Sequence, residues 1–168
     1  TPQYLMMLTG IFKQYPDAQI IWTHRHPKAV MKSISALIVK LGGIVSDSIN
    51  PYETAKQQIM NNNAAIAKAL ADRALLEQKG LGSRFCDVQF ETLCNDPLRV
   101  VRDIYKHFNK SLEDHVVSKM ENYVVNNARF KHGKPVVDLK NTFNVEPEDL
   151  KLGAFEAYAR DFVRGDST

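Results

Sequence analysis

The stretch Ile-Ile-Trp-Thr-His-Arg-His-Pro at residues 20–27 carries the strongest structural signal in this chain. A short apolar run ends in Thr-His-Arg, and Pro27 then opens a segment with helical spacing of apolar residues. This order predicts a buried strand whose carboxyl end delivers Arg25 to the start of a helix. Anions bind at such junctions, because unpaired N–H groups and the helix dipole favour negative charge. The stretch therefore predicts a phosphate site, although an ordinary turn with a solvated arginine fits the local pattern equally well.

The remaining sequence predicts helices around a second strand. The strands are expected at residues 18–23 and 84–90, and the first is apolar enough to be buried on both faces. Helices are expected at residues 3–14, from Pro27 to Gly42-Gly43, at 51–79, from Pro97, at 111–123 and from Glu146 onward, with a loop at 126–144. In the second helix, Val30, Ile34, Leu37 and Leu41 are expected to form a stripe that faces inward. Ser111 and Asp114 are expected to form a capping box at the start of the helix at 111–123. Each strand precedes a helix, as in an α/β protein with a parallel sheet. Two strands alone make no stable open sheet, so we expect further strands upstream of Thr1.

The composition is that of an ordinary globular domain. A chain of 168 residues with 44% hydrophobic and 24% charged residues can build one sizeable core. The 22 basic residues are scattered among 19 acidic ones, which argues against a nucleic-acid-binding stripe. No apolar window reaches the ~18 residues of a membrane span. We expect one domain over residues 1–168, incomplete at its N-terminus, in a cytoplasmic protein, with an upstream targeting segment left open.

Four segments in order resemble sulfotransferases that use 3′-phosphoadenosine 5′-phosphosulfate. Residues 1–5 resemble the family segment K-[ST]-P-x-H-L, and residues 15–27 resemble F-P-D-A-x-I-V-x-T-H-R-D-P. Residues 84–97 are similar to R-F-x-D-V-x-Y-E-D-L-x-x-D-P, and residues 143–162 resemble the family's closing F-G-L turn and helix. The resemblance covers essentially the whole chain. It implies a P-loop NTPase-like three-layer α/β domain, with a parallel sheet flanked by helices, that transfers a sulfuryl group to an acceptor hydroxyl or amine.

The resemblance also assigns residues to the binding of this co-substrate. The family's 3′-phosphate ligands fall on Arg25 and Ser33, and an arginine can indeed hold a phosphate through two N–H donors. Related enzymes place a late cationic loop over the same phosphate, which makes Lys131 and Lys134 candidates, although a solvated charge run is the default interpretation. No metal is expected, because no His-Cys cluster has ligand spacing.

The chain departs from the family pattern at several points. The glycine-rich loop that cradles the 5′-phosphosulfate is absent together with its lysine, and no catalytic base is identified. Tyr4 stands where many relatives have histidine, and residues 136–138 replace R-Y-S in the late loop. Thr92 replaces an aspartate, so we interpret Glu91 mainly as a structural hydrogen-bonding residue that fixes the following turn.

The remaining histidines and cysteines suggest structural roles. His24 is expected to point into the core and His26 to cap the following helix, with acid–base chemistry as the lesser alternative for both. Cys86 and Cys94 suggest neither a disulfide framework nor a metal site.

Two other functions stay open. One is a P-loop kinase or another phosphate-binding enzyme with the same strand-arginine-helix arrangement. The other is a non-catalytic remnant or partner-binding module. The expected partner is a small-molecule, glycan or peptide acceptor lying against the helix at residues 51–79, and the sequence leaves both its identity and a homo-oligomeric state open.

Overall fold

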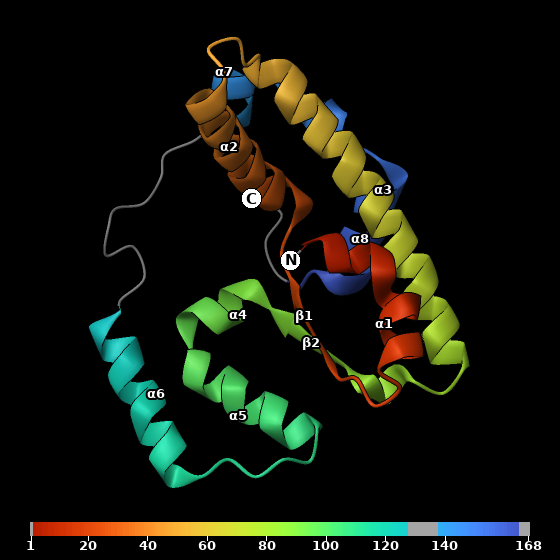
Figure 1. Ribbon diagram of the computed structural model, residues 1–168, viewed down its shortest axis with the longest axis vertical. Coiled ribbons are helices and arrows are strands. Elements are labelled where there is room, and N and C mark those ends of the chain that lie inside the picture. The colour runs from red at the N-terminus through yellow and green to blue at the C-terminus, as the bar shows by residue number, and fades with distance from the viewer. Residues whose placement is uncertain (1, 128–137, 165–168) are drawn as a thin grey trace.

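The computed structural model describes residues 2–127 and 138–164, in which helices surround a small parallel sheet (Figure 1). Strand β1 (Ile20–His24) pairs in parallel with β2 (Phe85–Gln89), and His24 lies beside Gln89. Parallel pairing brings the carboxyl ends of both strands to one edge of the sheet. The α/β class and both predicted strands are therefore confirmed.

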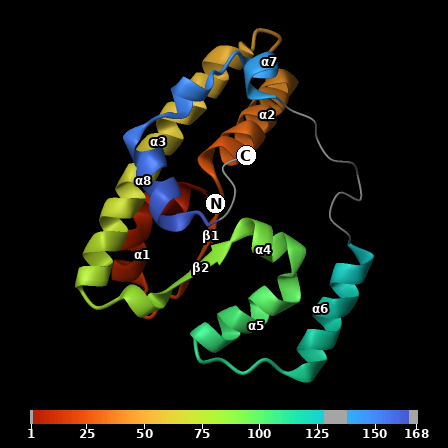
Figure 2. The same cartoon turned by 180° about the vertical axis from the view of Figure 1, so that it is seen from behind.

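The helical elements, with η marking a 3₁₀ helix, are η1 (Pro2–Met7), α1 (Leu8–Gln14), α2 (Pro27–Val45), α3 (Pro51–Gln78), η2 (Gly82–Arg84), α4 (Phe90–Asn95), α5 (Pro97–His107), α6 (Asp114–Asn126), α7 (Leu139–Phe143), η3 (Pro147–Leu150) and α8 (Gly153–Phe162). Helices α1 and α3 lie to one side of the strands, and α4, α5 and α6 lie to the other, as the views from front and back agree (Figures 1 and 2). None of the described helices combines the length and apolar character that a membrane crossing needs.

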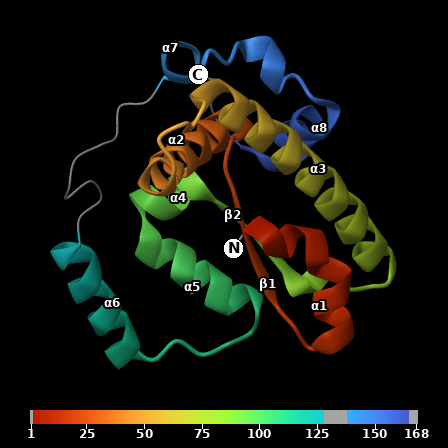
Figure 3. The same cartoon turned by 45° about the horizontal axis from the view of Figure 1, so that its top comes forward.

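Helix α3 is the element on which most of the structure packs. It begins where the sequence predicts, because Asn50 accepts a hydrogen bond from the Glu53 amide and Pro51 occupies the first turn. Its C-terminal half packs with α1 and the sheet in one hydrophobic cluster: Leu8, Phe12, Trp22, Ala69, Leu76, Phe85 and Tyr158. Its N-terminal half packs with α2, α7 and α8 in another: Met31, Ala55, Ile59, Leu139, Phe143, Val145 and Phe155. Figure 3 shows α3 running past α2, α8 and α1 in turn.

The polar Asn61–Asn63 interruption in the stripe of α3 has a structural use. The Asn63 side-chain oxygen accepts a hydrogen bond from the Phe155 amide at 3.3 Å, near the start of α8. Amides in the first turn of a helix have no partner within the helix, so this bond stabilises the beginning of α8 and fixes it against α3.

The two faces of the sheet are covered unequally, which corrects one prediction. Trp22 and His24 of β1 are buried toward α3 and α8, whereas Ile21 is 51% exposed and Thr23 is also exposed. Successive strand residues point to opposite faces, and α5 covers only β2 on the second face, through Val100. The expectation that β1 is buried on both faces is therefore wrong for the described residues.

Helix α2 differs from its prediction in both length and inward face. It continues through Gly42 and Gly43 to Val45, because glycine is permitted inside a helix at modest cost. Its buried residues are Pro27, Met31 and Ser35, while Leu37 and Leu41 are about half exposed. The expected stripe is thus rotated: Val30 and Ile34 flank the contact, and the leucines face away from it.

Four further elements differ from the sequence-based expectations. The short helices α4 and α7 occupy segments predicted as a strand end and a loop. The terminal helix is divided, because Glu146 and Asp149 form a capping box around η3 before α8 begins. Helix α6 starts after Glu113 with no side-chain cap, so the Ser111–Asp114 capping box is wrong.

Candidate functional site

The carboxyl ends of the two strands bring one cation, one aromatic ring and one carboxylate together. Arg25 follows β1 directly, and Phe90 and Glu91 follow β2 at the start of α4. The Arg25 guanidinium carbon lies 4.6 Å from the centre of the Phe90 ring, and its Nε lies 3.9 Å from Glu91 Oε1. The sequence placed Arg25 and Glu91 at their strand ends separately, but the contact between them depends on the pairing of the strands.

Arg25 has one donor, Nε, with no hydrogen-bond partner in the described part of the chain. Its side chain is 32% exposed, yet its Nε atom is buried and has no hydrogen-bond partner among the described residues. Buried N–H groups are nearly always paired, because an unpaired one costs about 1–3 kcal/mol. A cation held over an aromatic ring with an unsatisfied donor is suited to an anionic ligand.

Only two of the four predicted phosphate ligands, Arg25 and Ser33, lie among the described residues. Ser33 is exposed on α2, two turns beyond Arg25, and its hydroxyl makes no hydrogen bond within the described part of the chain. Lys131 and Lys134 lie outside the described residues. Of the four residues expected to bind the co-substrate, the structure therefore characterises Arg25 as part of a site and Ser33 as an accessible hydroxyl.

The start of α2 is formed as the sequence predicts. Pro27 occupies the first turn, and His26 Nδ1 accepts a hydrogen bond from the Lys28 amide at 3.2 Å. Partial burial, and then the nearby Lys28 charge, lower the pKa of the His26 imidazole. The capping role of His26 is therefore confirmed, and its lowered pKa favours the neutral ring that accepts this bond.

On the opposite face of the strand end, His24 is the centre of a buried polar network. Its side chain is buried as expected, with Nδ1 at 3.0 Å from the Tyr158 hydroxyl and Nε2 at 2.7 Å from Asp87 Oδ1. Asp87 also receives two hydrogen bonds from Arg73, at 2.6 and 2.7 Å. Arg73 donates a further bond to Glu77 at 2.7 Å. The network connects β1, β2, α3 and α8.

The charges in this network determine its proton positions. Burial alone would raise the pKa of Asp87, but hydrogen bonds from Arg73 and His24 outweigh it and hold the pKa well below its usual range. An ionised carboxylate only accepts, so His24 donates from Nε2. Burial raises the pKa of Tyr158 to about 12, partly opposed by a hydrogen bond from the Arg25 backbone. The phenol stays protonated and can donate to Nδ1 of His24.

Aromatic rings enclose the network. The His24 ring stacks on Phe162 and Trp22 with centroid distances of 5.2 and 5.4 Å, and the Arg73 guanidinium lies 4.7 Å from the Phe162 centroid. Sequence reasoning missed Asp87 and Tyr158 as partners of His24, and Arg73 as the partner of Asp87. Only Asp87 carried a signal, as the aspartate of the R-F-x-D-V resemblance.

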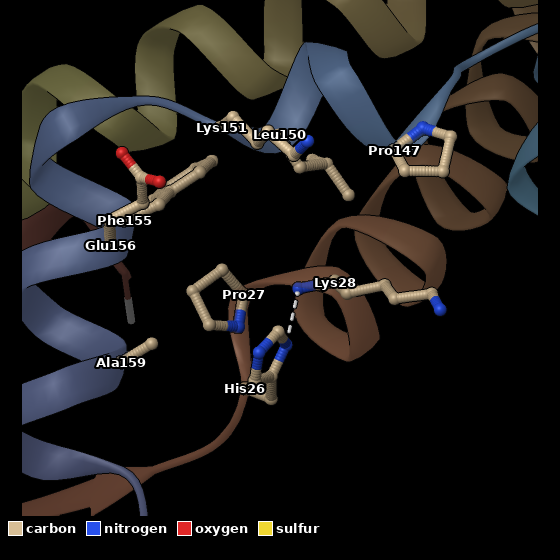
Figure 4. Close-up of a pocket in the computed structure, with 9 residues that line it drawn as sticks. All are labelled: His26, Pro27, Lys28, Pro147, Leu150, Lys151, Phe155, Glu156 and Ala159. Carbon is tan, nitrogen blue, oxygen red and sulfur yellow. Dashed lines mark hydrogen bonds between the residues drawn. The ribbon is translucent and has the colours of Figure 1, made fainter. Parts of the chain in front are cut away.

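A shallow pocket of about 200 Å³ lies beside the start of α2, against η3 and α8 (Figure 4). Its lining residues are His26, Pro27, Lys28, Pro147, Leu150, Lys151, Phe155, Glu156 and Ala159. Lys28 and Lys151 supply positive charge around a largely apolar wall. Neither Arg25 nor Ser33 lines it, so it is separate from the Arg25 site. In the described segments, no group of three or more His, Cys, Asp or Glu side chains has metal-binding geometry.

Comparisons with known proteins agree with this architecture. The chain is similar in structure to sulfotransferase STF9 from Mycobacterium avium, with a TM-score of 0.83 at 20% sequence identity, over 96% of this chain and 40% of that chain. The likeness confirms the P-loop-like sulfotransferase fold expected from the sequence, and this chain spans less than half the length of that protein. A search of curated proteins gives no significant match.

Family membership is decided by a different comparison. A model of the sulfotransferase family matches residues 1–114, which is more than half of the chain and includes both strands, Arg25 and Ser33. The chain therefore belongs to the sulfotransferase family.

Proposed function

We propose that this chain is part of an enzyme that transfers a sulfuryl group from 3′-phosphoadenosine 5′-phosphosulfate, and that Arg25 binds the 3′-phosphate of this donor. The observation that supports it most is the Arg25 side chain, held over Phe90 with a buried Nε that lacks a hydrogen-bond partner among the described residues. A phosphate monoester offers the acceptor oxygens and the charge that this donor lacks.

The surroundings of Arg25 fit such a ligand. The carboxyl edge of a parallel sheet is where α/β proteins bind nucleotides, and the 19-residue helix α2 starts two residues after Arg25. The helix dipole adds a favourable potential for an anion, and the exposed Ser33 hydroxyl on α2 is available to donate to it. The ion pair with Glu91 is loose at 3.9 Å, so a dianionic phosphate can displace it.

The role of these residues in transfer is positioning. Arg25 and Ser33 would anchor the nucleotide end of the donor, and Lys131 and Lys134 would add charge to the same phosphate. Sulfuryl transfer resembles phosphoryl transfer, in which orientation and charge stabilisation account for most of the acceleration. These four residues serve the nucleotide end of the donor and not its sulfuryl end. The acceptor, a hydroxyl or amine, would lie toward α3.

Calorimetric titration with adenosine 3′,5′-bisphosphate tests the proposal directly. Removing a charge-assisted phosphate contact costs about 2–3 kcal/mol, so Arg25→Ala should weaken binding roughly 30- to 150-fold. Arg99→Ala is the matched control, because Arg99 is exposed on α5 and pairs only loosely with Asp103 at 3.9 Å. Equal affinities for wild type and Arg25→Ala would refute the assignment.

The same titration separates the alternative enzyme class. A sulfotransferase site discriminates for the 3′-phosphate, whereas a kinase-like site discriminates for a triphosphate. If ATP binds to this site and adenosine 3′,5′-bisphosphate does not, the phosphate-binding alternative replaces this proposal.

A further inference from the structure

We propose that Tyr158 is a positioning residue for Arg25: by holding His24, it fixes the end of β1 and thereby the direction of the guanidinium on the next residue. The inference rests on the proposed function only for the identity of the ligand that Arg25 binds. It adds a contribution from α8, which the family resemblance does not assign to the phosphate site.

His24 is held at two points and has little freedom to move. Both ring nitrogens have partners, Tyr158 at 3.0 Å and Asp87 at 2.7 Å, and the side chain is 1% exposed. The Phe162 ring lies nearly parallel to the imidazole, at an interplanar angle of 20°. Rotating the imidazole would break both bonds inside a packed cluster, so the backbone at His24 is fixed as well.

Arg25 takes its direction from this fixed point. His24 and Arg25 are consecutive, yet the His24 ring stacks on Phe162 of α8, while the Arg25 side chain reaches Glu91 at the start of α4. The Arg25 backbone also interacts with the Tyr158 hydroxyl. The Tyr158 hydroxyl therefore acts on the strand end mainly through its bond to His24, the residue before Arg25.

Tyr158 can hold this position because α8 is itself anchored. The Asn63 side chain accepts a hydrogen bond from the Phe155 amide near the start of α8, and Phe155 is buried in the cluster between α2, α3 and α7. The Tyr158 side chain is 5% exposed and stacks on Phe162 at 5.9 Å. Removing only the hydroxyl leaves this packing in place, which separates positioning from folding.

The test compares wild type, Tyr158→Phe, Arg25→Ala and the double variant by titration with adenosine 3′,5′-bisphosphate. Loss of one positioning hydrogen bond should weaken binding roughly 3- to 10-fold when Arg25 is present. In the Arg25→Ala background the same change should have no effect, because the group it orients is gone. Additive losses, or an unchanged affinity of Tyr158→Phe, would overturn the inference. Tyr123→Phe is the matched control, since Tyr123 is 69% exposed on α6.

A second readout needs no ligand and separates this inference from the proposed function. The buried Arg25 Nε–H should give a distinct NMR signal that broadens or exchanges faster in Tyr158→Phe but not in Tyr123→Phe. If that occurs while the wild type does not bind the bisphosphate, the proposed function is wrong and the positioning role stands. An unchanged Arg25 signal would overturn the positioning role, whatever binds.

His24→Gln provides an independent variant should Tyr158→Phe not fold. A glutamine amide reaches the position of Nε2 and keeps the bond to Asp87, but leaves Tyr158 without its partner on β1. It should reproduce the affinity loss and the altered Arg25 signal. A fully wild-type response of His24→Gln would contradict the inference.

Discussion

Two arginines at the sheet, Arg25 and Arg73, use the same chemistry for different purposes. Both lie over aromatic rings, Arg25 at 4.6 Å from Phe90 and Arg73 at 4.8 Å from Phe85. Arg73 is 7% exposed and donates three hydrogen bonds to two carboxylates. Arg25 is more exposed, and within residues 2–127 and 138–164 it has a loose ion pair with Glu91 and a buried donor without a hydrogen-bond partner.

The difference indicates which arginine belongs to the fold and which to a ligand. A buried cation with all its charge compensated stabilises the protein, and removing it leaves an unpaired carboxylate. A cation with an unused donor adds little to stability and is available for binding. The sequence alone does not show which of these two roles an arginine has. The role depends on the partners that surround the arginine in the folded protein.

Replacement of Arg73 should give the largest effect on stability. Arg73→Met keeps apolar contact with the surrounding rings but removes the bonds to Asp87 and Glu77. We expect about 2–4 kcal/mol of destabilisation, toward the lower part of the range for a broken buried pair because the Asp87 side chain is 37% exposed. In thermal unfolding this is a decrease of roughly 5–15 °C.

Arg25→Met is the matched control for that experiment. The variant loses the cation–π contact with Phe90 but also removes the cost of the unpaired Nε, so we expect no destabilisation beyond about 0.5 kcal/mol. If Arg25→Met destabilised the protein as much as Arg73→Met, the distinction between the two arginines would be lost.

Asp87 gives the comparison a pH dependence. Its pKa in the folded state lies below its unfolded value, so its contribution is fully present above about pH 4 and is lost as the pH falls toward the folded pKa. Asp87→Asn should cost about 1–2 kcal/mol at pH 7, and its deficit relative to wild type should shrink below pH ~4. Chemical denaturation at several pH values measures this. A deficit that grew in acid would contradict the assignment of Asp87 as the ionised partner.

The two sites also differ in how far the sequence predicts them. The place of Arg25 at the end of β1 was predicted because the signals for it are local: an apolar strand, the Thr-His-Arg end and a proline that starts α2. The burial of His24 was predicted as well. Its partners were not, because Tyr158 lies 134 residues away in the chain and Asp87 63 residues away. Such contacts depend on strand pairing and on the docking of α8, which periodicity does not encode.

The same limit explains the errors in helix orientation. The apolar positions of α2 were recognised, but Leu37 and Leu41 face away from the contact because the direction of a helix stripe depends on what packs against it. Where sequence and structure agree best, at α3, the start is marked by a local cap at Asn50 and Pro51.

The smallest predicted effect concerns Glu91, which shares the guanidinium of Arg25 with the proposed phosphate. An exposed carboxylate at 3.9 Å from Nε competes with an incoming anion and repels it weakly. Glu91→Gln should therefore tighten binding of adenosine 3′,5′-bisphosphate by roughly 2- to 5-fold at low salt, with the gain reduced as ionic strength rises. Titrations of both proteins at two salt concentrations provide the measurement. Weaker binding by Glu91→Gln would instead show that Glu91 orients Arg25 for the ligand, so that its ion pair supports the site in the way that Glu77 supports Arg73.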